Sequence, residues 1–433
     1  MSEPRTGRFG RDVLQSFGFI AIQAALAFVN SVVIARLGGP EARGLYGLAV
    51  AILALAWPIA ALGQQGATVY LLGKGRPAGA VAGLNSLLSL ALVPLALTTA
   101  GLAWQLGGSS PSATTTMAIA CAALCVPAAV LFETVRHDFL GRGRVLAYNL
   151  CQVGLTGLLL ALNVVLVARG GTGVLIALTG AWVGTAVVLG LIRACGRPRL
   201  RVPGRALVRE ALAYGKREAL TRLSEAGLMR TDLLVLALIV DLPALGIFAI
   251  ADQIANLMAW LGQAAGRMMF AHSARDTEGI EVRRKLGLIT RLLIVYSGLA
   301  GLAAIALAWW LIPLIYTDAF ASAYWGLVLL LPAVLFKGVH AVVARYHAGQ
   351  GHQRPVVRAG VAALVVDVVL VALLAPLWGW EAAALAKSIA LAVQLGIVLA
   401  ADRRLYPQAP LELVPRRSDL DALLAWVRAR ARR

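Results

Sequence analysis

Long apolar runs separated by short polar connections dominate this chain. Between residues 13 and 402 the sequence divides into twelve runs that reach about the 20 residues needed to cross a hydrocarbon core. Apolar positions are continuous within each run rather than alternating, which excludes a β-barrel and leaves helices. The predicted helices span 13–35, 44–72, 79–105, 115–136, 146–168, 172–194, 212–240, 244–271, 287–315, 322–348, 357–376 and 380–402.

Composition narrows the class further. Of 433 residues, 60% are hydrophobic and only 14% are charged, whereas soluble domains carry about 25% charged residues. A soluble enzyme, a disordered scaffold and a nucleic-acid-binding domain are therefore excluded, and an all-α membrane protein is expected. The first run, Val13 to Ala35, spans a membrane and lacks a cleavage site, so it is a helix rather than a signal peptide. The four cysteines indicate neither a zinc site nor a disulfide framework, and no cofactor is expected.

The distribution of basic residues predicts the topology. On one side of the predicted helices, the termini and connections hold 31 of the 40 Lys and Arg residues. The opposite connections hold only Arg36, Arg43 and Arg169. Because cytoplasmic loops are enriched in Lys and Arg, both termini are predicted to be cytoplasmic. The remaining six basic residues lie inside predicted helices and need a separate explanation: Arg222, Arg230, Arg267, Lys337, Arg345 and Lys387.

A weak internal repeat divides the chain into two halves. Residues 40–49 and 243–251 share a pattern of Gly, aliphatic, aromatic and small residues when Gly44 is aligned with Gly246. The Gly-rich turn at 141–144 has a counterpart at 349–354. Six helices in each half make this a parallel repeat, which predicts two six-helix lobes around a central substrate cavity. The predicted parts are an N-lobe (1–195), a basic cytoplasmic linker (196–211), a C-lobe (212–402) and a basic cytoplasmic tail (403–433). The pattern of the tail suits a short interfacial helix on anionic lipid, and the alternative is a tail whose charge serves topology alone.

Four motifs then carry a specific resemblance. The segments Pro40–Ala49, Gly141–Arg144, Gly246–Gln253 and Gly349–Gly351 look like turns of the polysaccharide transporter family. That family belongs to the superfamily of lipid-linked oligosaccharide flippases, the lipid II flippase and multidrug and toxin extrusion proteins. The resemblance implies twelve or more helices in two lobes and outward movement of a lipid-linked saccharide across the plasma (bacterial inner) membrane.

Charged stripes on the predicted helices mark the candidate site. Glu218, Arg222, Glu225 and Asp232 fall within about 80° of one another around one helix. A charge at the bilayer centre costs at least about 2.5–3.5 kcal/mol, so these side chains must face a wet cavity or one another. The alternative is a set of structural ion pairs between packed helices.

Other helices continue this pattern. Asp252, Asn256, Gln263 and Arg267 share a stripe on the predicted helix 244–271, and Gln23 and Asn30 share one on the first helix. The diphosphate of a polyprenyl carrier needs several Lys or Arg side chains to replace its hydration. The predicted substrate-cavity residues are Arg222, Arg230, Arg267, Lys337, Arg345, Lys387, Gln23, Asn30, Asn256 and Gln263. The predicted ion-coupling carboxylates are Glu225, Asp232, Asp252 and Asp367, with Asp252 and Glu225 ranked first.

These observations favour a flippase for a polyprenyl-diphosphate-linked oligosaccharide that works by alternating access in cell-surface polysaccharide (lipopolysaccharide) biosynthesis. The expected partners are the lipid-linked glycan, anionic lipids and a glycan polymerase or glycosyltransferases. The closest alternative is an exporter of drugs or small metabolites on the same fold. A membrane glycan-modifying enzyme is disfavoured, because the outer loops are short and Arg136-His137-Asp138 has the pattern of a cytoplasmic helix end.

Overall fold

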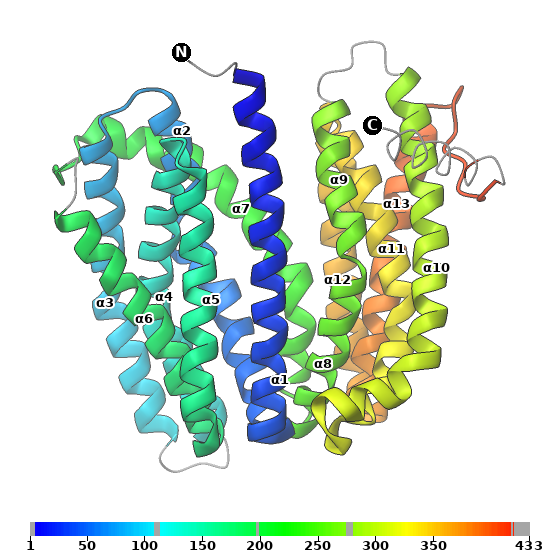
Figure 1. The fold of residues 1–433 in the computed structure, drawn as a ribbon, viewed down its shortest axis with the longest axis horizontal. Helices are drawn as coiled ribbons and strands as arrows, with labels where there is room; N and C mark the ends of the chain where they lie inside the picture. The colour runs from blue at the N-terminus through cyan, green and yellow to red at the C-terminus, as the bar shows by residue number, and fades with distance from the viewer. Residues whose placement is uncertain (1–4, 108–112, 196–198, 274–279, 417–418, 420–433) are drawn as a thin grey trace. The chain divides into compact units, whose positions relative to one another are not determined.

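The structure, a computed structural model, describes residues 5–107, 113–195, 199–273, 280–416 and Asp419. Within these residues all regular structure is helical, so the predicted all-α class is confirmed (Figure 1). Nine of the described helices are long and apolar enough to cross a membrane, and one bent pair adds a tenth. The protein is therefore a multi-pass membrane protein.

Thirteen α-helices make up the described part of the chain. The first seven are α1 (Arg5–Ala60), α2 (Gln64–Gly73), α3 (Ala78–Gly107), α4 (Ala113–Gly141), α5 (Val145–Leu166), α6 (Gly171–Cys195) and α7 (Arg205–Leu236). The remaining six are α8 (Leu242–Met258), α9 (Trp260–Ser273), α10 (Ile280–Tyr316), α11 (Ala323–Gly349), α12 (Gln353–Trp378) and α13 (Glu381–Leu405).

Each of the twelve predicted runs falls on helix, and the differences lie at breaks. The first two runs form α1 together, with a non-helical kink at Gly39 (φ 72°) immediately before Pro40. Gly63, also left-handed, divides the second run into the end of α1 and α2. The run 244–271 is a bent pair, α8 and α9, at an angle of 43°. The charged helix α7 is not among the helices apolar enough to span alone, and a twelve-helix count is consistent with these observations.

The internal repeat has a backbone counterpart. Gly143 and Gly351 are both left-handed, with φ of 71° and 82°, in the turns that follow α4 and α11. Three backbone hydrogen bonds close the first turn. The same three bonds, between residues at matching positions, close the second turn. Gly170 and Gly379 also match, with φ and ψ of 71° and −151° against 69° and −148°, in the turns before α6 and α13. The two halves therefore share the turns that set their helix connections.

The chain folds into two compact units. One contains Met1–Ala237 with Asp241–Gly246, and the other contains Leu238–Val240 with Ile247–Arg433. Helix α7 thus groups with the first unit, although the repeat assigns it to the second half. The predicted lobe boundary at residues 196–211 stays a prediction.

Glycines explain why α7 packs with α1 and α2. A Cβ on Gly63 would lie 2.1 Å from the carbonyl oxygen of Gly215, so the two backbones approach as only glycine permits. Beside this contact the rings of Tyr70 and Tyr214 stack with centroids 4.4 Å apart. Arg76 pairs with Glu210 at 2.8 Å. These contacts hold the amino-terminal half of α7 against α2.

Candidate functional site

A buried polar network joins α8, α11 and α13 in the second unit. The Nζ atom of Lys387 on α13 lies 2.7 Å from Oδ1 of Asp252 on α8. The other carboxylate oxygen of Asp252 accepts a hydrogen bond of 2.9 Å from the side-chain amide of Asn256. Asn256 in turn accepts a hydrogen bond from Lys337 on α11. The network therefore brings together four predicted site residues that are spread over 135 positions of sequence.

All three charged side chains of this network are withdrawn from solvent. Asp252, Lys387 and Lys337 are 6%, 5% and 9% exposed. An ammonium group loses its hydration at such a position and requires an anion or a hydrogen-bond acceptor in return. The structure supplies acceptors from α8.

The bend between α8 and α9 lies directly after the acceptor residues. Asp252 and Asn256 occupy the last turns of α8, and the chain bends by 43° before α9 begins at Trp260. The hydroxyl of Tyr296 on α10 donates to the carbonyl of Met258, the last residue of α8. A kink of this kind is a place where helices change direction. The acceptors thus lie within two turns of the point at which the chain changes direction between α8 and α9.

Two glycines hold α9 close to α11. Gly262 and Gly266 form a Gly-x-x-x-Gly motif, and Cβ atoms at these positions would lie 2.5 Å from Gly338 and 2.6 Å from the carbonyl of Ala341. Small residues at this spacing allow membrane helices to pack backbone against backbone. The contact lies beside Lys337, because Gly338 directly follows it on α11.

The other predicted site residues of this unit lie in three kinds of environment. Arg267 and Arg345 are exposed, and Gln263 is half-buried. The carboxylate of Asp367 on α12 is 1% exposed and lies away from solvent like that of Asp252. Only Asp252, Asn256, Lys337 and Lys387 are joined to one another by the hydrogen bonds described above.

In the first unit, the predicted residue Asn30 belongs to a chain of amides and a phenol. The side-chain amide of Asn163 on α5 donates to Asn30 on α1 at 2.9 Å, and Asn30 approaches the hydroxyl of Tyr46 at 3.5 Å. Arg43 stands over the Tyr46 ring, with the guanidinium carbon 5.7 Å from the ring centroid. Arg230 of α7 lies close enough to Tyr46 to interact with it electrostatically. The structure thus brings Asn30 and Arg230 to the same tyrosine.

Three predicted residues of α7 and one of α1 remain. Asp232 is 1% exposed near the end of α7, and Gln23 is half-buried on α1. The side chains of Arg222 and Glu225 lie outside the part of the structure that is described. Their assignment to the cavity and to ion coupling stays a prediction.

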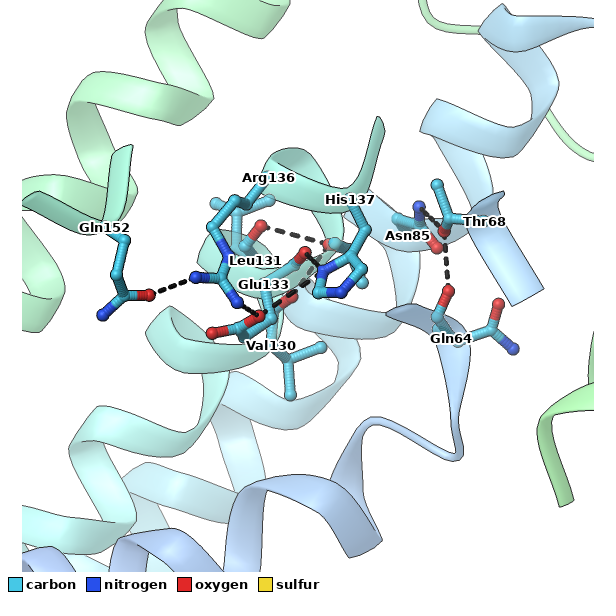
Figure 2. Close-up of polar contacts among 10 residues, drawn as sticks. Gln64, Thr68, Asn85, Val130, Leu131, Glu133, Arg136, His137 and Gln152 are labelled. Atoms are coloured by element: carbon cyan, nitrogen blue, oxygen red, sulfur yellow. Dashed lines mark hydrogen bonds and ion pairs between the residues drawn. The ribbon is translucent and has the colours of Figure 1, made fainter. Parts of the chain in front are cut away.

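A second polar network, which the sequence did not predict, surrounds Glu133 on α4. Arg136 places one nitrogen 2.8 Å from the Glu133 carboxylate and donates from another to the amide oxygen of Gln152 on α5. The Nδ1 of His137 donates to the Glu133 carbonyl at 2.7 Å and lies 3.4 Å from its carboxylate. Figure 2 shows Arg136 between Gln152 and Glu133, with His137 on the other side of the carboxylate.

Helix α4 continues to Gly141, so Arg136-His137-Asp138 lies in its last two turns and Glu133 lies about 12 Å before its end. Arg136 turns back toward Glu133 and stacks over Tyr148 at 4.5 Å. The signal that could have found the network is Glu133 with Arg136 and His137 at i+3 and i+4, since these spacings share one helix face.

Neutral polar groups lie beside this network. The amide of Asn85 on α3 donates to the hydroxyl of Thr68 at 2.8 Å, and that hydroxyl donates to the carbonyl of Gln64 at 2.7 Å (Figure 2). All three residues are buried. Gln64 begins α2 directly after left-handed Gly63, where the predicted helix 44–72 is broken. Buried amides and hydroxyls of the first unit therefore lie beside the network around Glu133.

The segment after α13 is tied to α10. Arg283 forms two hydrogen bonds with Asp402, at 2.8 and 2.7 Å, and donates to the carbonyl of Ala409. Further along α10, Arg291 pairs with Asp419 at 2.7 Å, and its guanidinium lowers the pKa of that carboxyl. The predicted interfacial helix of the tail involves residues 417–418 and 420–433, which lie outside the described residues.

Comparison with known proteins decides the family. A family model described as "Polysaccharide biosynthesis protein" matches residues 9–264, more than half of the chain. The chain belongs to the polysaccharide biosynthesis protein family. The resemblance that the turn motifs carry is thereby confirmed. A search of curated protein sequences gives no match.

Solved structures similar to this family member are transporters. A lipid II flippase MurJ in an inward closed conformation matches with a TM-score of 0.77 at 11% identity, over 90% of this chain and 87% of that one. An inward-facing multidrug resistance transporter of the MATE family matches with a TM-score of 0.71 at 16% identity. The match covers 91% of this chain and 98% of that one. A third match is a MOP superfamily transporter from Pyrococcus furiosus, described with a binding pocket of reverse polarity. Its TM-score is 0.51 at 14% identity, and the match covers 92% of this chain and 95% of that one. These likenesses establish that the chain shares the fold of these solved structures.

Proposed function

We propose that the chain is a flippase that moves a polyprenyl-diphosphate-linked oligosaccharide from the cytoplasmic to the outer leaflet of the plasma membrane by alternating access. The termini are cytoplasmic in this proposal, because 31 of the 40 Lys and Arg residues lie on their side. Membership of the polysaccharide biosynthesis family supports a glycan cargo. A glycan polymerase or glycosyltransferases act before or after the chain in this proposal, and anionic lipids contact its basic tail.

The observation that carries the proposal is the buried pair of lysines, Lys337 and Lys387. A diphosphate presents several oxygens and more than one negative charge, so it is able to accept hydrogen bonds from two ammonium groups at once. Asn256, which already accepts from Lys337, adds an amide that is able to donate. The saccharide needs no charge of its own for this recognition. The predicted residues Arg230, Arg267 and Arg345 extend the set of cations available to the carrier.

Among the predicted ion-coupling carboxylates, Asp252 is the best supported, because it contacts Lys387 directly. A change in the protonation of Asp252 alters the charge that Lys387 faces. Asp232 and Asp367 are buried as well and remain candidates for the same role. This arrangement is compatible with three sources of driving energy. These are protons, sodium ions and the membrane potential acting on the charged cargo.

An exporter of drugs or small metabolites is the second candidate, favoured by the likeness to a MATE transporter at a TM-score of 0.71. The lysines argue against organic cations as its cargo, since two buried ammonium groups repel a positive ligand. An anionic metabolite would satisfy them equally well. The two candidates therefore differ in the cargo and not in the fold.

A vesicle assay separates these candidates. Purified protein is reconstituted into liposomes that carry a fluorescent polyprenyl-diphosphate disaccharide, and an impermeant glycosidase reports which sugars face outward. A second set of the same liposomes is tested for uptake of ethidium, an organic cation. We expect protein-dependent movement of the lipid-linked sugar and no uptake of ethidium. Uptake of ethidium without movement of the sugar would reverse the ranking.

A further inference from the structure

The side chain of Asp252 occupies the position that an anionic ligand would need. Its Oδ1 lies 2.7 Å from the ammonium of Lys387, within the range of a charge-assisted hydrogen bond. Its Oδ2 accepts the amide of Asn256, whose own oxygen accepts from Lys337. One carboxylate therefore reaches both lysines, the first directly and the second through an amide.

We propose that Asp252 is a built-in competitor for the phosphate of the cargo, and that binding exchanges its carboxylate for a phosphate oxygen at Lys387. This inference rests on the proposed function and adds that the same lysine alternates between an internal and an external anion. No covalent bond forms or breaks in the exchange. The ammonium keeps its charge and changes only the oxygen to which it donates.

Burial makes the exchange necessary. Lys387 is 5% exposed and Asp252 is 6% exposed, so water cannot readily take the place of either partner. Separating such a pair without a substitute leaves an uncompensated charge in a region of low dielectric constant. A phosphate that arrives with its own negative charge avoids that cost for the lysine. The displaced carboxylate then needs a new donor or a proton.

The bend after α8 provides a route for the carboxylate to withdraw. Asp252 and Asn256 lie on α8, whereas the two lysines lie on α11 and α13. The 43° bend between α8 and α9 lets α8 shift while α9 stays packed against α11 through Gly262 and Gly266. Withdrawal of α8 removes both acceptors together. The exchange thus links binding of an anion to movement of one helix.

Charged groups on the helices that form the network, and on α12 beside them, bear on this exchange. On α8 the network contains Asp252, on α11 Lys337, and on α13 Lys387. Helix α12, which packs against α13, contributes the buried carboxylate of Asp367, and α13 also carries buried Gln394. The four residues of the network hold two ammonium groups and one carboxylate. An incoming anion is therefore not repelled by the network as a whole.

The test measures binding of inorganic pyrophosphate and of farnesyl diphosphate by titration calorimetry, with the full chain in lipid nanodiscs at constant ionic strength. We expect Asp252→Asn to tighten binding of both probes by about tenfold, because the competitor is gone, and Lys387→Gln to weaken it by a similar factor. In the double variant Asp252→Asn/Lys387→Gln the gain should vanish. Glu381→Gln, which removes an acid from the same helix as Lys387, is the charge-matched control and should leave binding unchanged.

If Asp252→Asn does not fold, Asp252→Ser serves as the second variant, since its hydroxyl keeps a hydrogen-bond acceptor for Lys387, and the same direction of change is expected. Equal or weaker binding by either Asp252 variant, with Lys387→Gln still weaker than wild type, would overturn the competitor role and leave the proposed function standing. Equal tightening by Glu381→Gln would assign the effect to bulk charge and also overturn it. Absence of diphosphate binding by the wild type would contradict both proposals.

Discussion

The two halves of the molecule share their turns and differ in their interiors. Gly143 and Gly351 close matching turns with matching hydrogen bonds. The polar network of the second unit contains two lysines and one acid, whereas that of the first contains Glu133 held by Arg136 with His137 beside it. The repeat therefore preserves the connections between helices, and the chemistry of each half is determined separately by a few buried side chains.

The largest effect is expected from breaking the ion pair between Lys387 and Asp252 in the second unit. Lys387→Met alone should destabilise the protein by about 3–5 kcal/mol, because it leaves Asp252 as an uncompensated buried charge. The double variant Asp252→Asn/Lys387→Met should recover most of this loss. Thermal unfolding in detergent, followed by tryptophan fluorescence, measures both. A single variant as stable as the wild type would contradict burial of the pair.

The next effect concerns a close contact between the two repeat-related segments that contain Gly44 on α1 and Gly246 on α8. A Cβ on Gly44 would lie 1.9 Å from the carbonyl oxygen of Leu242, and a Cβ on Gly246 would lie 2.1 Å from that of Pro40. Gly44→Ala and Gly246→Ala should each cost about 1–3 kcal/mol, because a backbone must move to make room. Gly101→Ala on α3, which meets nothing within 4 Å, is the control and should be neutral or slightly stabilising. Equal unfolding temperatures for all three would show that the contact is not formed.

In the first unit, Glu133→Gln should have a smaller effect than the loss of Lys387. Arg136 keeps its hydrogen bond to Gln152 and its stacking on Tyr148 when the carboxylate is neutralised. The loss should be about 1–2 kcal/mol, typical of a hydrogen bond to a charged group. Unfolding midpoints of Glu133→Gln and Gln152→Ala, measured side by side, check this. A loss as large as that of Lys387→Met would mean that the two networks are equivalent in energy.

The sequence predicted the helices because apolar length and turn glycines act locally. It singled out Asp252, Asn256, Lys337 and Lys387 because charged and polar side chains are rare inside membrane helices, and their roles in the cavity and in ion coupling stay predictions. It could not predict which of these residues meet, since they come from three helices whose packing depends on Gly262 and Gly266. It missed Glu133 because Arg136 and His137 follow it directly and resemble a basic helix end. It predicted one helix over 44–72, and the structure breaks that helix at Gly63, which adopts a left-handed conformation within an apolar run.

The smallest effect should be equal in the two halves. Gly143→Ala and Gly351→Ala each force a Cβ into a left-handed conformation, which costs roughly 1 kcal/mol. Neither position has an atom within 4 Å of the added Cβ, so only the backbone preference is measured. Matching shifts in unfolding temperature would agree with matching turns. A shift in only one of them would show that the repeat does not extend to the stability of the turns.

The role of the lysines is tested most directly by transport of two lipids that differ by one phosphate. Reconstituted wild type and the folded double variant Asp252→Asn/Lys387→Gln are compared in the glycosidase assay, with a polyprenyl-diphosphate disaccharide and the corresponding monophosphate. We expect the wild type to move the diphosphate at least about tenfold faster than the monophosphate, because each added phosphate oxygen gives the lysines a further acceptor, and we expect the variant to lose this preference. Retention of the full preference by the variant would contradict a role for Lys387 in recognising the cargo.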